Sequence, residues 1–218
     1  MIIDVAFRIL GTEIIPQDHG YALYSSISRL HPILHAADWL AIHPISGFPG
    51  ERGLALTTRS RLQLRLPSEK LPAVLPLVGK PLALSNANGT VRIRLGVPEV
   101  YALKPSRVLQ SRCVVIKVSE IERSGRSPDR EMFLAAVLEQ MQSRDIKGEV
   151  WIDDRCDGKG RELSRRIVRI KDKTIVGYSV RVSGLMTDDD SIKLQEVGLG
   201  GRHRMGCGIF VPLNIKGR

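Results

Sequence analysis

The side chains in this chain best suited to acid–base chemistry are its histidines, of which there are five. A histidine has an ordinary pKa near 6.5, so it can take up or release a proton at neutral pH. In a basic protein this suits RNA cleavage, because the ribose 2′-OH is a built-in nucleophile that needs only proton transfer and charge stabilisation. Such cleavage uses no metal and leaves a 2′,3′-cyclic phosphate and a 5′-OH. By position, His35 and His43 are the leading candidates.

Each histidine also has a plain structural interpretation. His19 falls in the first turn of an expected helix, and His31 ends that helix just before Pro32. His43 lies within an expected strand, where half-burial would explain it equally well. A metal site that uses His31 and His35 is a weaker alternative, because Pro32 interrupts the helix between them. No metal is therefore expected.

A second chemical feature is the glycine-rich stretch from Gly198 to Gly208, which holds five glycines and two arginines in eleven residues. Glycine lets a backbone come close to phosphate oxygens and arginine supplies charge, so the stretch predicts contact with RNA. A turn that needs glycine only for its geometry is the alternative. The stretch does not join a first strand to a helix as a P-loop does, so no nucleotide cofactor is expected. The RNA-binding candidates here are Gly198, Gly200, Gly201, Arg202, His203, Arg204, Gly206 and Gly208.

The charge of the chain points to a polyanionic partner. Its formal net charge is +10 and its pI is about 9.9, and both halves of the chain share the excess. Aromatic residues make up only 5%, so base stacking is not expected to dominate binding. Three scattered cysteines indicate free thiols in the reducing cytoplasm, and neither a membrane span nor a secretion signal is expected.

The hydrophobic pattern predicts the same order of elements twice, strand-helix-strand-strand-helix-strand. The fold class is therefore α+β, with two tandem ferredoxin-like units. The first unit, residues 1–100, carries the candidate catalytic histidines. The second, residues 108–218, carries the glycine-rich stretch and a basic hairpin, and the linker runs from about Pro98 to Leu109. The hairpin candidates for binding an RNA stem are Arg165, Arg166, Arg169 and Lys171.

Two groups of residues resemble a known family. The spacing Gly198-x-Gly200-x₅-Gly206-x-Gly208 before the last strand resembles the glycine-rich loop of the repeat-associated (RAMP) RNA-binding proteins of CRISPR systems. Residues 16–24, followed by Leu34-His35 and by residues 42–45, resemble the CRISPR repeat-processing endoribonuclease of the Cas-six type. The C-terminal residues 196–212 are most similar to the compact variant of the myxococcal subtype. The resemblance spans the whole chain.

The resemblance implies metal-independent cleavage of precursor CRISPR RNA within its repeat, with other CRISPR effector subunits as further partners. The family's histidine follows the first helix, which matches His35 best and leaves His43 and His31 open. Its hydroxyl-bearing helper matches Tyr24 and Ser28. The lysine that often follows the histidine has no counterpart between Arg29 and Lys70, so Arg52 would have to serve.

Two alternatives remain from the sequence. The chain could be a non-catalytic RAMP subunit that only holds CRISPR RNA in an effector complex. It could also be a basic RNA-binding assembly protein built on the same folds. Cleavage of repeat RNA in the presence of EDTA separates the enzyme from both.

Overall fold

The computed structural model describes residues 1–11, 13–86, 89–116, 129–153, 155–158, 160 and 162–213, with the side chain of residue 86 left out. The chain divides into two compact units. The first comprises Met1–Ala102 together with Arg204–Gly206, and the second comprises the rest of the chain. A short piece of the glycine-rich stretch therefore belongs to the first unit. Both units combine antiparallel sheets with few helices, so the fold is of the mixed α/β kind that the sequence predicts.

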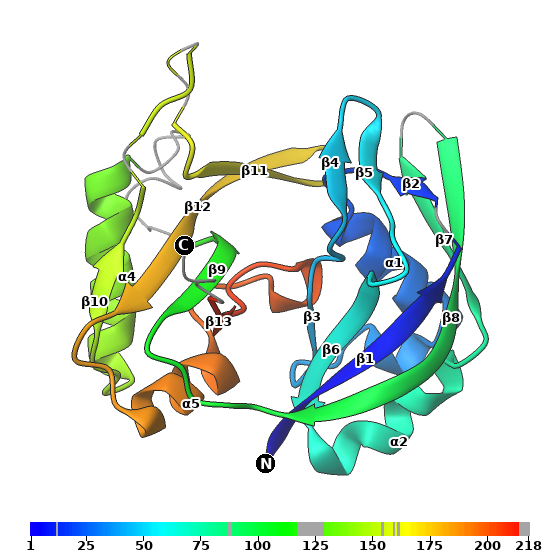
Figure 1. Cartoon of the computed structure of the whole chain (residues 1–218), viewed down its shortest axis with the longest axis horizontal. Coiled ribbons are helices and arrows are strands. Elements are labelled where there is room, and N and C mark those ends of the chain that lie inside the picture. The colour runs from blue at the N-terminus through cyan, green and yellow to red at the C-terminus, as the bar shows by residue number, and fades with distance from the viewer. Residues whose placement is uncertain are drawn as a thin grey trace. The chain divides into compact units, whose positions relative to one another are not determined.

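The sheet of the first unit has five strands in the order β3-β6-β1-β8-β7 (Figure 1). Its longer strands alternate as half-buried strands must: Val5 and Phe7 of β1 point into the core, while Asp4 lies on the opposite face. The bounds are β1 Ile2–Leu10, β3 Ala41–Ile42, β6 Arg61–Pro67, β7 Pro81–Asn86 and β8 Gly89–Ala102. A smaller sheet in the order β2-β5-β4 is made by β2 Ile14–Ile15, β4 Phe48–Gly50 and β5 Gly53–Ala55.

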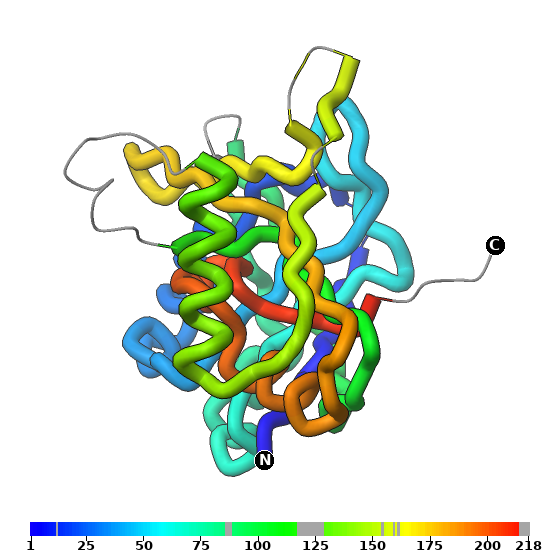
Figure 2. The backbone as a smooth tube through the Cα atoms, turned by 90° about the vertical axis from the view of Figure 1, so that its left-hand side faces the viewer, coloured from blue at the N-terminus to red at the C-terminus, as the bar shows by residue number. Residues whose placement is uncertain are grey.

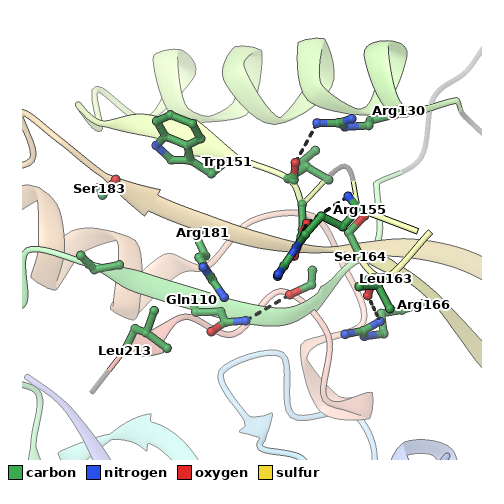
Figure 3. Close-up of a pocket in the computed structure, with 14 residues that line it drawn as sticks. Gln110, Arg130, Trp151, Arg155, Leu163, Ser164, Arg166, Arg181, Ser183 and Leu213 are labelled. Atoms are coloured by element: carbon green, nitrogen blue, oxygen red, sulfur yellow. Dashed lines mark hydrogen bonds and ion pairs between the residues drawn. The ribbon is translucent and has the colours of Figure 1, made fainter. Parts of the chain in front are cut away.

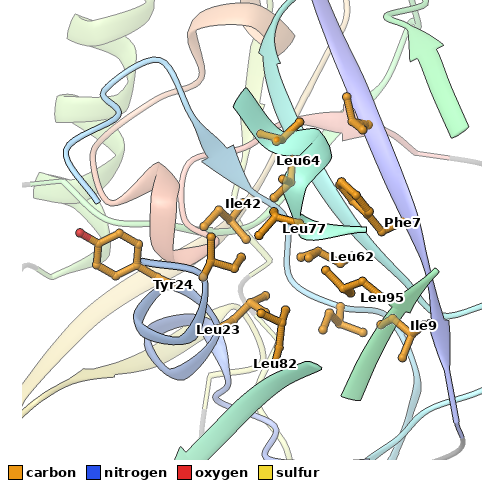
Figure 4. Packing of buried hydrophobic residues seen from close by; sticks show 14 of the residues in the cluster. Phe7, Ile9, Leu23, Tyr24, Ile42, Leu62, Leu64, Leu77, Leu82 and Leu95 are labelled. Atoms are coloured by element: carbon orange, nitrogen blue, oxygen red, sulfur yellow. The ribbon is translucent and has the colours of Figure 1, made fainter. Parts of the chain in front are cut away.

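Helix α1, Gly20–Leu30, ends before Pro32, as the sequence predicts, but it begins after His19, which is its N-cap and does not lie in the first turn. Its apolar face packs onto the sheet, and Figure 4 shows Leu23 among the strand residues of this core. A second helix, α2, is short, Leu71–Val74, and is flanked by turns of 3-10 helix. The labelled core residues in Figure 4 are Phe7, Ile9, Leu23, Tyr24, Ile42, Leu62, Leu64, Leu77, Leu82 and Leu95.

The second unit has a sheet in the order β10-β12-β9-β13, with β11 paired to the other part of β12. Helix α4, Arg130–Ser143, runs beside β10 (Figure 2), and α5 is Asp188–Val197. Asp129 caps α4 and Thr187 caps α5 through a capping box with Asp190. The strands are β9 Leu109–Val114, β10 Glu149–Trp151, β11 Arg165–Ile170, β12 Lys173–Ser183 and β13 Val211–Pro212.

Some boundaries differ from the prediction. The expected linker begins too early, because β8 continues to Ala102, where it still pairs with Ile3 of β1. The edge strand β7 was not predicted, since Pro81 at its start argues against a strand and only the partner arm of this hairpin alternates clearly. The hydrophobic pattern also predicts a strand over residues 112–118, and residues 117 and 118 lie outside the described part of the chain. No helix among the described residues is long and apolar enough to cross a membrane.

Candidate active site

Tyr24 and His35 form the centre of a polar cluster in the first unit. The Tyr24 hydroxyl donates to the backbone carbonyl of His35 at 2.9 Å and lies 3.2 Å from His35 Nδ1. The two rings are stacked, with centroids 5.6 Å apart and planes 24° apart. Tyr24 is only 8% exposed, whereas His35 is exposed. Burial of the tyrosine therefore holds a histidine that remains accessible to a ligand.

The phenol hydrogen bonds determine which ring nitrogen of His35 is available. A tyrosine hydroxyl has one proton, and the His35 carbonyl accepts it. The contact with Nδ1 is then made by an N–H on Nδ1 that donates to the phenol oxygen. In a neutral imidazole this leaves Nε2 without a proton. The atom that can accept a proton from a ligand is therefore His35 Nε2.

Arg204 completes the cluster from the glycine-rich stretch. Its Nη1 donates to the same carbonyl of His35, and its guanidinium carbon lies 5.5 Å from the centre of the Tyr24 ring. Guanidinium groups stack well on aromatic rings and carry five N–H donors. One donor is occupied by the carbonyl, so the remaining donors can face a phosphate.

Local sequence explains why these three side chains meet. Pro32 opens a 3-10 turn, Pro32–Leu34, that follows α1 directly and carries His35 at its end. Leu34, which is fully buried, anchors that turn in the core. Tyr24 lies within α1 with its ring in the same core, and Figure 4 shows its hydroxyl pointing away from the packed leucines. The hydroxyl therefore emerges where the turn brings His35.

Two glycines allow Arg204 to reach this place. A Cβ on Gly20, the first residue of α1, would lie 2.3 Å from the carbonyl oxygen of Met205. Gly206 has φ +83°, and a Cβ there would lie 3.0 Å from Pro44. A side chain at Gly20 would clash, and one at Gly206 would be strained by the positive φ, so these glycines let the segment Arg204–Gly206 sit against α1 and Pro44.

The other end of the glycine-rich stretch is packed on itself. A Cβ on Gly208 would lie 2.1 Å from the Leu199 carbonyl oxygen, and one on Gly198 would lie 2.3 Å from the Gly208 carbonyl oxygen. The ring of His203 fills the space between Gly198 and Gly208, and burial lowers its pKa although the carbonyl groups beside it act in the opposite direction. His203, predicted to touch RNA, is thus packed inside the loop.

Only one of the five glycines in this stretch is open. Gly200 also has a positive φ, and its Cβ would lie 2.2 Å from the Val115 carbonyl oxygen. Gly201 has nothing within 4 Å of the place where a Cβ would be, and both it and Arg202 are exposed. The turn-geometry alternative therefore accounts for Gly198, Gly200, Gly206 and Gly208, while Gly201 can still bring its backbone close to a ligand.

His43 has a different environment from His35. Its side chain is buried, and Nε2 lies 3.5 Å from Oδ1 of Asp4 without making a hydrogen bond of ordinary geometry to any described residue. Arg65 donates to both carboxylate oxygens of Asp4, at 2.8 and 2.9 Å. Burial opposes the charge on Asp4, but the contacts with Arg65 and His43 outweigh it and lower the pKa of Asp4. Burial also lowers the pKa of His43, despite the nearby Asp4.

The structure separates the other predicted site residues. His19 is buried, where Nε2 accepts from the Ile45 backbone N–H and Nδ1 contacts the Pro16 carbonyl, so it joins two loops. Ser28 lies one turn after Tyr24 on α1, with a buried hydroxyl that has no partner among the described residues. Arg52 lies in the exposed turn between β4 and β5, and no described hydrogen bond or ring contact links it to His35.

The predicted basic hairpin does not present its charges on one face. Arg165 and Arg169 alternate with Arg166 along β11, so Arg166 points to the opposite face of the sheet. There it donates to the carbonyls of Leu163 and Arg165. Lys171 lies at the turn with φ 53°. Among the described residues, no group of three or more metal-ligating side chains could hold a metal ion.

Known proteins that are similar to this chain identify its family. The model of a family described as Cas6 Crispr matches residues 3–214. The chain belongs to the Cas6 family. It is 32% identical over 212 residues to a Myxococcus xanthus (strain DK1622) protein named CRISPR-associated endonuclease Cas6, a match that covers 97% of this chain and 82% of that protein. The resemblance that the sequence suggested is confirmed.

Solved structures share the fold of this Cas6 family member. A structure titled CRISPR associated protein Cas6 has a TM-score of 0.62 and 17% identity, covering 98% of this chain and 99% of that chain. A Cas6-related protein from Pyrococcus furiosus has the same TM-score with 15% identity, covering 99% of each chain. A RAMP protein described as binding different RNA substrates has a TM-score of 0.58 and 13% identity, covering 96% of this chain and 98% of that chain.

The sequence pattern does not predict the place of Arg204 in the cluster. It predicts RNA binding for this residue, and the family resemblance implies Arg52 for the charge beside the histidine. No sequence signal ties position 204 to position 35, because the link depends on packing between segments far apart in the chain. Gly20 was the available hint, since a glycine at the first position of a helix has no propensity advantage there.

Proposed function

We propose that this Cas6 family member is a metal-independent endoribonuclease that cleaves precursor CRISPR RNA within its repeat. The observation that carries the proposal is the cluster of Tyr24, His35 and Arg204, in which an accessible imidazole is held by a buried tyrosine beside a guanidinium. These groups match what 2′-OH attack requires, namely proton transfer and stabilisation of negative charge. The naming of the Myxococcus relative as an endonuclease supports the same reaction class.

In the proposed reaction His35 Nε2 removes the proton of the ribose 2′-OH. The 2′ oxygen attacks the adjacent phosphorus, the bond from phosphorus to the 5′ oxygen breaks, and the products are a 2′,3′-cyclic phosphate and a 5′-OH. The net reaction moves one proton from O2′ to O5′, so one imidazole can serve by accepting the proton and returning it. The contact between Nδ1 and Tyr24 favours the tautomer that this requires.

Arg204 is the proposed stabiliser of the charge that develops on the phosphate. Its position over the Tyr24 ring and against the His35 carbonyl fixes the guanidinium next to the reacting imidazole. This assigns to Arg204 the role that the family resemblance implied for Arg52. Ser28, on the same helix as Tyr24, was the other hydroxyl predicted for the site, but its hydroxyl is buried, so Tyr24 alone is proposed for that role.

RNA is proposed to bind through exposed cationic groups of both units. Gly201 and Arg202 offer an open backbone and a charged side chain in the glycine-rich stretch. Arg165 and Arg169 form an exposed pair on one face of β11. Phosphate contacts of this kind position RNA without selecting its sequence. The proposed setting is the cytoplasm, where the three cysteines of the chain stay reduced.

The proposed architecture is two ferredoxin-like units in tandem, with the histidine site in the first and the main RNA-binding groups in the second. The sheet orders support it: β3-β6-β1-β8 and β10-β12-β9-β13 both follow the pattern second, third, first, fourth strand of a β-α-β-β-α-β unit. The strand β7 extends the first sheet, and β11 extends the second.

Cleavage of a labelled repeat RNA in the presence of EDTA tests the proposed function. We expect cleavage at one position, with a 5′-OH on the downstream product, and no cleavage of a substrate whose ribose at that position is 2′-deoxy. Binding of the repeat without cleavage would instead indicate a non-catalytic subunit of a CRISPR complex. Cleavage that requires a divalent metal would contradict the proposal.

A further inference from the structure

The second unit has a cavity of about 630 Å³ on the side of β12 that faces away from the core. Along this strand Ser179, Arg181 and Ser183 line the cavity, while Val180 and Val182 between them are fully buried in the core. This volume lies in the range of small-molecule sites. The cavity shares only one residue, Arg166, with the RNA-binding candidates predicted from the sequence.

Trp151 at the end of β10 forms an apolar wall of this cavity (Figure 3). This residue is 59% exposed, which leaves a large aromatic surface in water. Such exposure is uncommon for tryptophan unless a partner covers the ring. A flat ring of this kind on a sheet face is the surface on which nucleic-acid bases stack.

Four arginines line the cavity, Arg130, Arg155, Arg166 and Arg181, against one acidic residue, Asp153. Arg155 forms a two-pronged ion pair with Asp153, with a shortest distance of 2.6 Å. Arg130 and Arg166 each donate to a backbone carbonyl, at 2.8 and 2.6 Å. Arg181 makes no hydrogen bond or ion pair with any described residue. The cavity therefore has an excess of positive charge, and Arg181 keeps its donors for a ligand.

A buried hydroxyl also lines this cavity without a partner. Ser164 is 1% exposed, and its Oγ makes no hydrogen bond to any described residue. Buried polar groups are nearly always satisfied, so an orphaned one in a cavity wall indicates a missing ligand or water. Gln110 lies on the neighbouring strand β9, and its amide nitrogen donates to Ser179 at 3.2 Å. Its amide oxygen then remains as an acceptor.

We propose that this cavity binds one unpaired nucleotide of an RNA strand. The base stacks on Trp151, the phosphate is bound by Arg181, and Ser164 and Gln110 contact polar groups of the nucleotide. The proposal rests on the function proposed above, in that RNA is the ligand, and it adds a subsite that holds a nucleotide by stacking. A free mononucleotide has the same chemistry, so the test must distinguish the two sources.

The fluorescence of Trp151 reports on this subsite directly. The chain has two tryptophans, so Trp39→Phe leaves Trp151 as the single reporter, and His35→Ala in the same chain prevents cleavage during the titration. Addition of single-stranded repeat RNA is expected to quench the fluorescence, and UMP or AMP at matched concentration is expected to leave it unchanged. Quenching by the mononucleotides but not by the RNA would overturn the assignment to RNA.

Substitutions then measure what the subsite contributes to RNA affinity. Trp151→Ala is expected to weaken RNA binding roughly 5- to 150-fold, the range given by stacking energies of ~1–3 kcal/mol per base. Trp151→Phe, which keeps a ring, is expected to retain most of the affinity. A loss of affinity in Trp151→Ala can then be assigned to the missing ring, even if the alanine variant is less stable. The matched control is Leu138→Ala, an exposed apolar residue on α4 that lies outside the cavity.

The phosphate contact has its own pair of variants. Arg181→Gln is expected to weaken RNA binding and to reduce the slope of log affinity against log salt by about 0.7, the value for one phosphate on a single strand. Lys193→Gln on α5 makes the same change of charge away from the cavity and is expected to leave the slope unchanged. Full affinity in both Trp151→Ala and Arg181→Gln overturns the subsite. Repeat cleavage by the unaltered chain would still stand, so this failure is distinct from failure of the proposed function.

Discussion

The Tyr24 hydroxyl donates its single proton to the backbone carbonyl of His35, 2.9 Å away. Its oxygen can therefore accept a hydrogen bond from the Nδ1–H of the same histidine, at 3.2 Å. Two contacts from one residue thereby fix both the orientation and the tautomer of an exposed imidazole. Arg204 donates to the same carbonyl, so the charge and the base are held by one backbone group. In the reaction proposed above, this relationship gives Tyr24 the role of positioning His35.

Removal of the Tyr24 hydroxyl tests that role. Tyr24→Phe is expected to keep the ring stacked in the core while freeing the imidazole, and to lower the single-turnover cleavage rate roughly tenfold with repeat affinity unchanged. Tyr21→Phe, a neighbouring tyrosine on the same helix, is the control. An unchanged rate in Tyr24→Phe would remove the tyrosine from the mechanism.

Arg204 and Arg202 are two residues apart, but alanine substitutions at the two positions are expected to have different effects. Arg204→Ala should slow cleavage by roughly 100-fold or more, because a positioned charge beside the reacting phosphate is lost. Arg202→Ala should leave the rate at saturating RNA unchanged and reduce the salt slope of binding by about 0.7–0.9, as expected for one phosphate contact. Single-turnover rates and binding titrations at several salt concentrations measure both. The opposite pattern would exchange the two assignments.

The glycines of the C-terminal stretch are predicted to divide into structural and ligand-facing positions. Gly208→Ala should destabilise the fold by ~1–3 kcal/mol or more. The backbone of Gly208 has a positive φ, and an added Cβ would clash with the Leu199 carbonyl. Gly201→Ala should change the free energy of unfolding by less than about 0.5 kcal/mol. Urea unfolding measures both variants. Gly201→Val should nevertheless weaken RNA binding, and unchanged affinity in that variant would exclude close approach of RNA at this glycine.

The buried histidine His43 predicts an acid-sensitive fold. Its lowered pKa means that the unfolded chain takes up the proton first, so stability is lost as the pH falls below about 6.5. The lowered pKa of Asp4 predicts a second loss as the pH falls below about 3.9. His43→Gln should reduce the loss of unfolding free energy between pH 7 and pH 5, whereas His31→Gln, at a partly exposed position, should not. Equal pH dependence in both variants would contradict this account.

Sequence patterns predicted the features that depend on residues close together in the chain. The helix Gly20–Leu30 followed from its apolar spacing and Pro32, and the family followed from residues 16–24 and the glycine stretch. Patterns could not rank the histidines, because burial of His43 and exposure of His35 are set by packing rather than by neighbours in sequence.

The glycine-rich stretch also shows what could not be predicted from composition. Its composition indicated phosphate contact, yet four of its five glycines are explained by contacts of the loop with itself, with Val115 and with Pro44. Arg204 joins the candidate site through its hydrogen bond to the His35 carbonyl. A motif that looks like a ligand-binding loop is here also the structural link that carries a charge to a distant histidine.

The most direct test compares His35→Ala with His43→Ala in single-turnover cleavage of repeat RNA in EDTA, with binding measured in parallel. The account predicts that His35→Ala loses roughly 100-fold or more in rate at unchanged RNA affinity. His43→Ala should lose stability but cleave at close to the normal rate under conditions where it is folded. Normal cleavage by His35→Ala, with the rate lost in folded His43→Ala, would contradict the central claim.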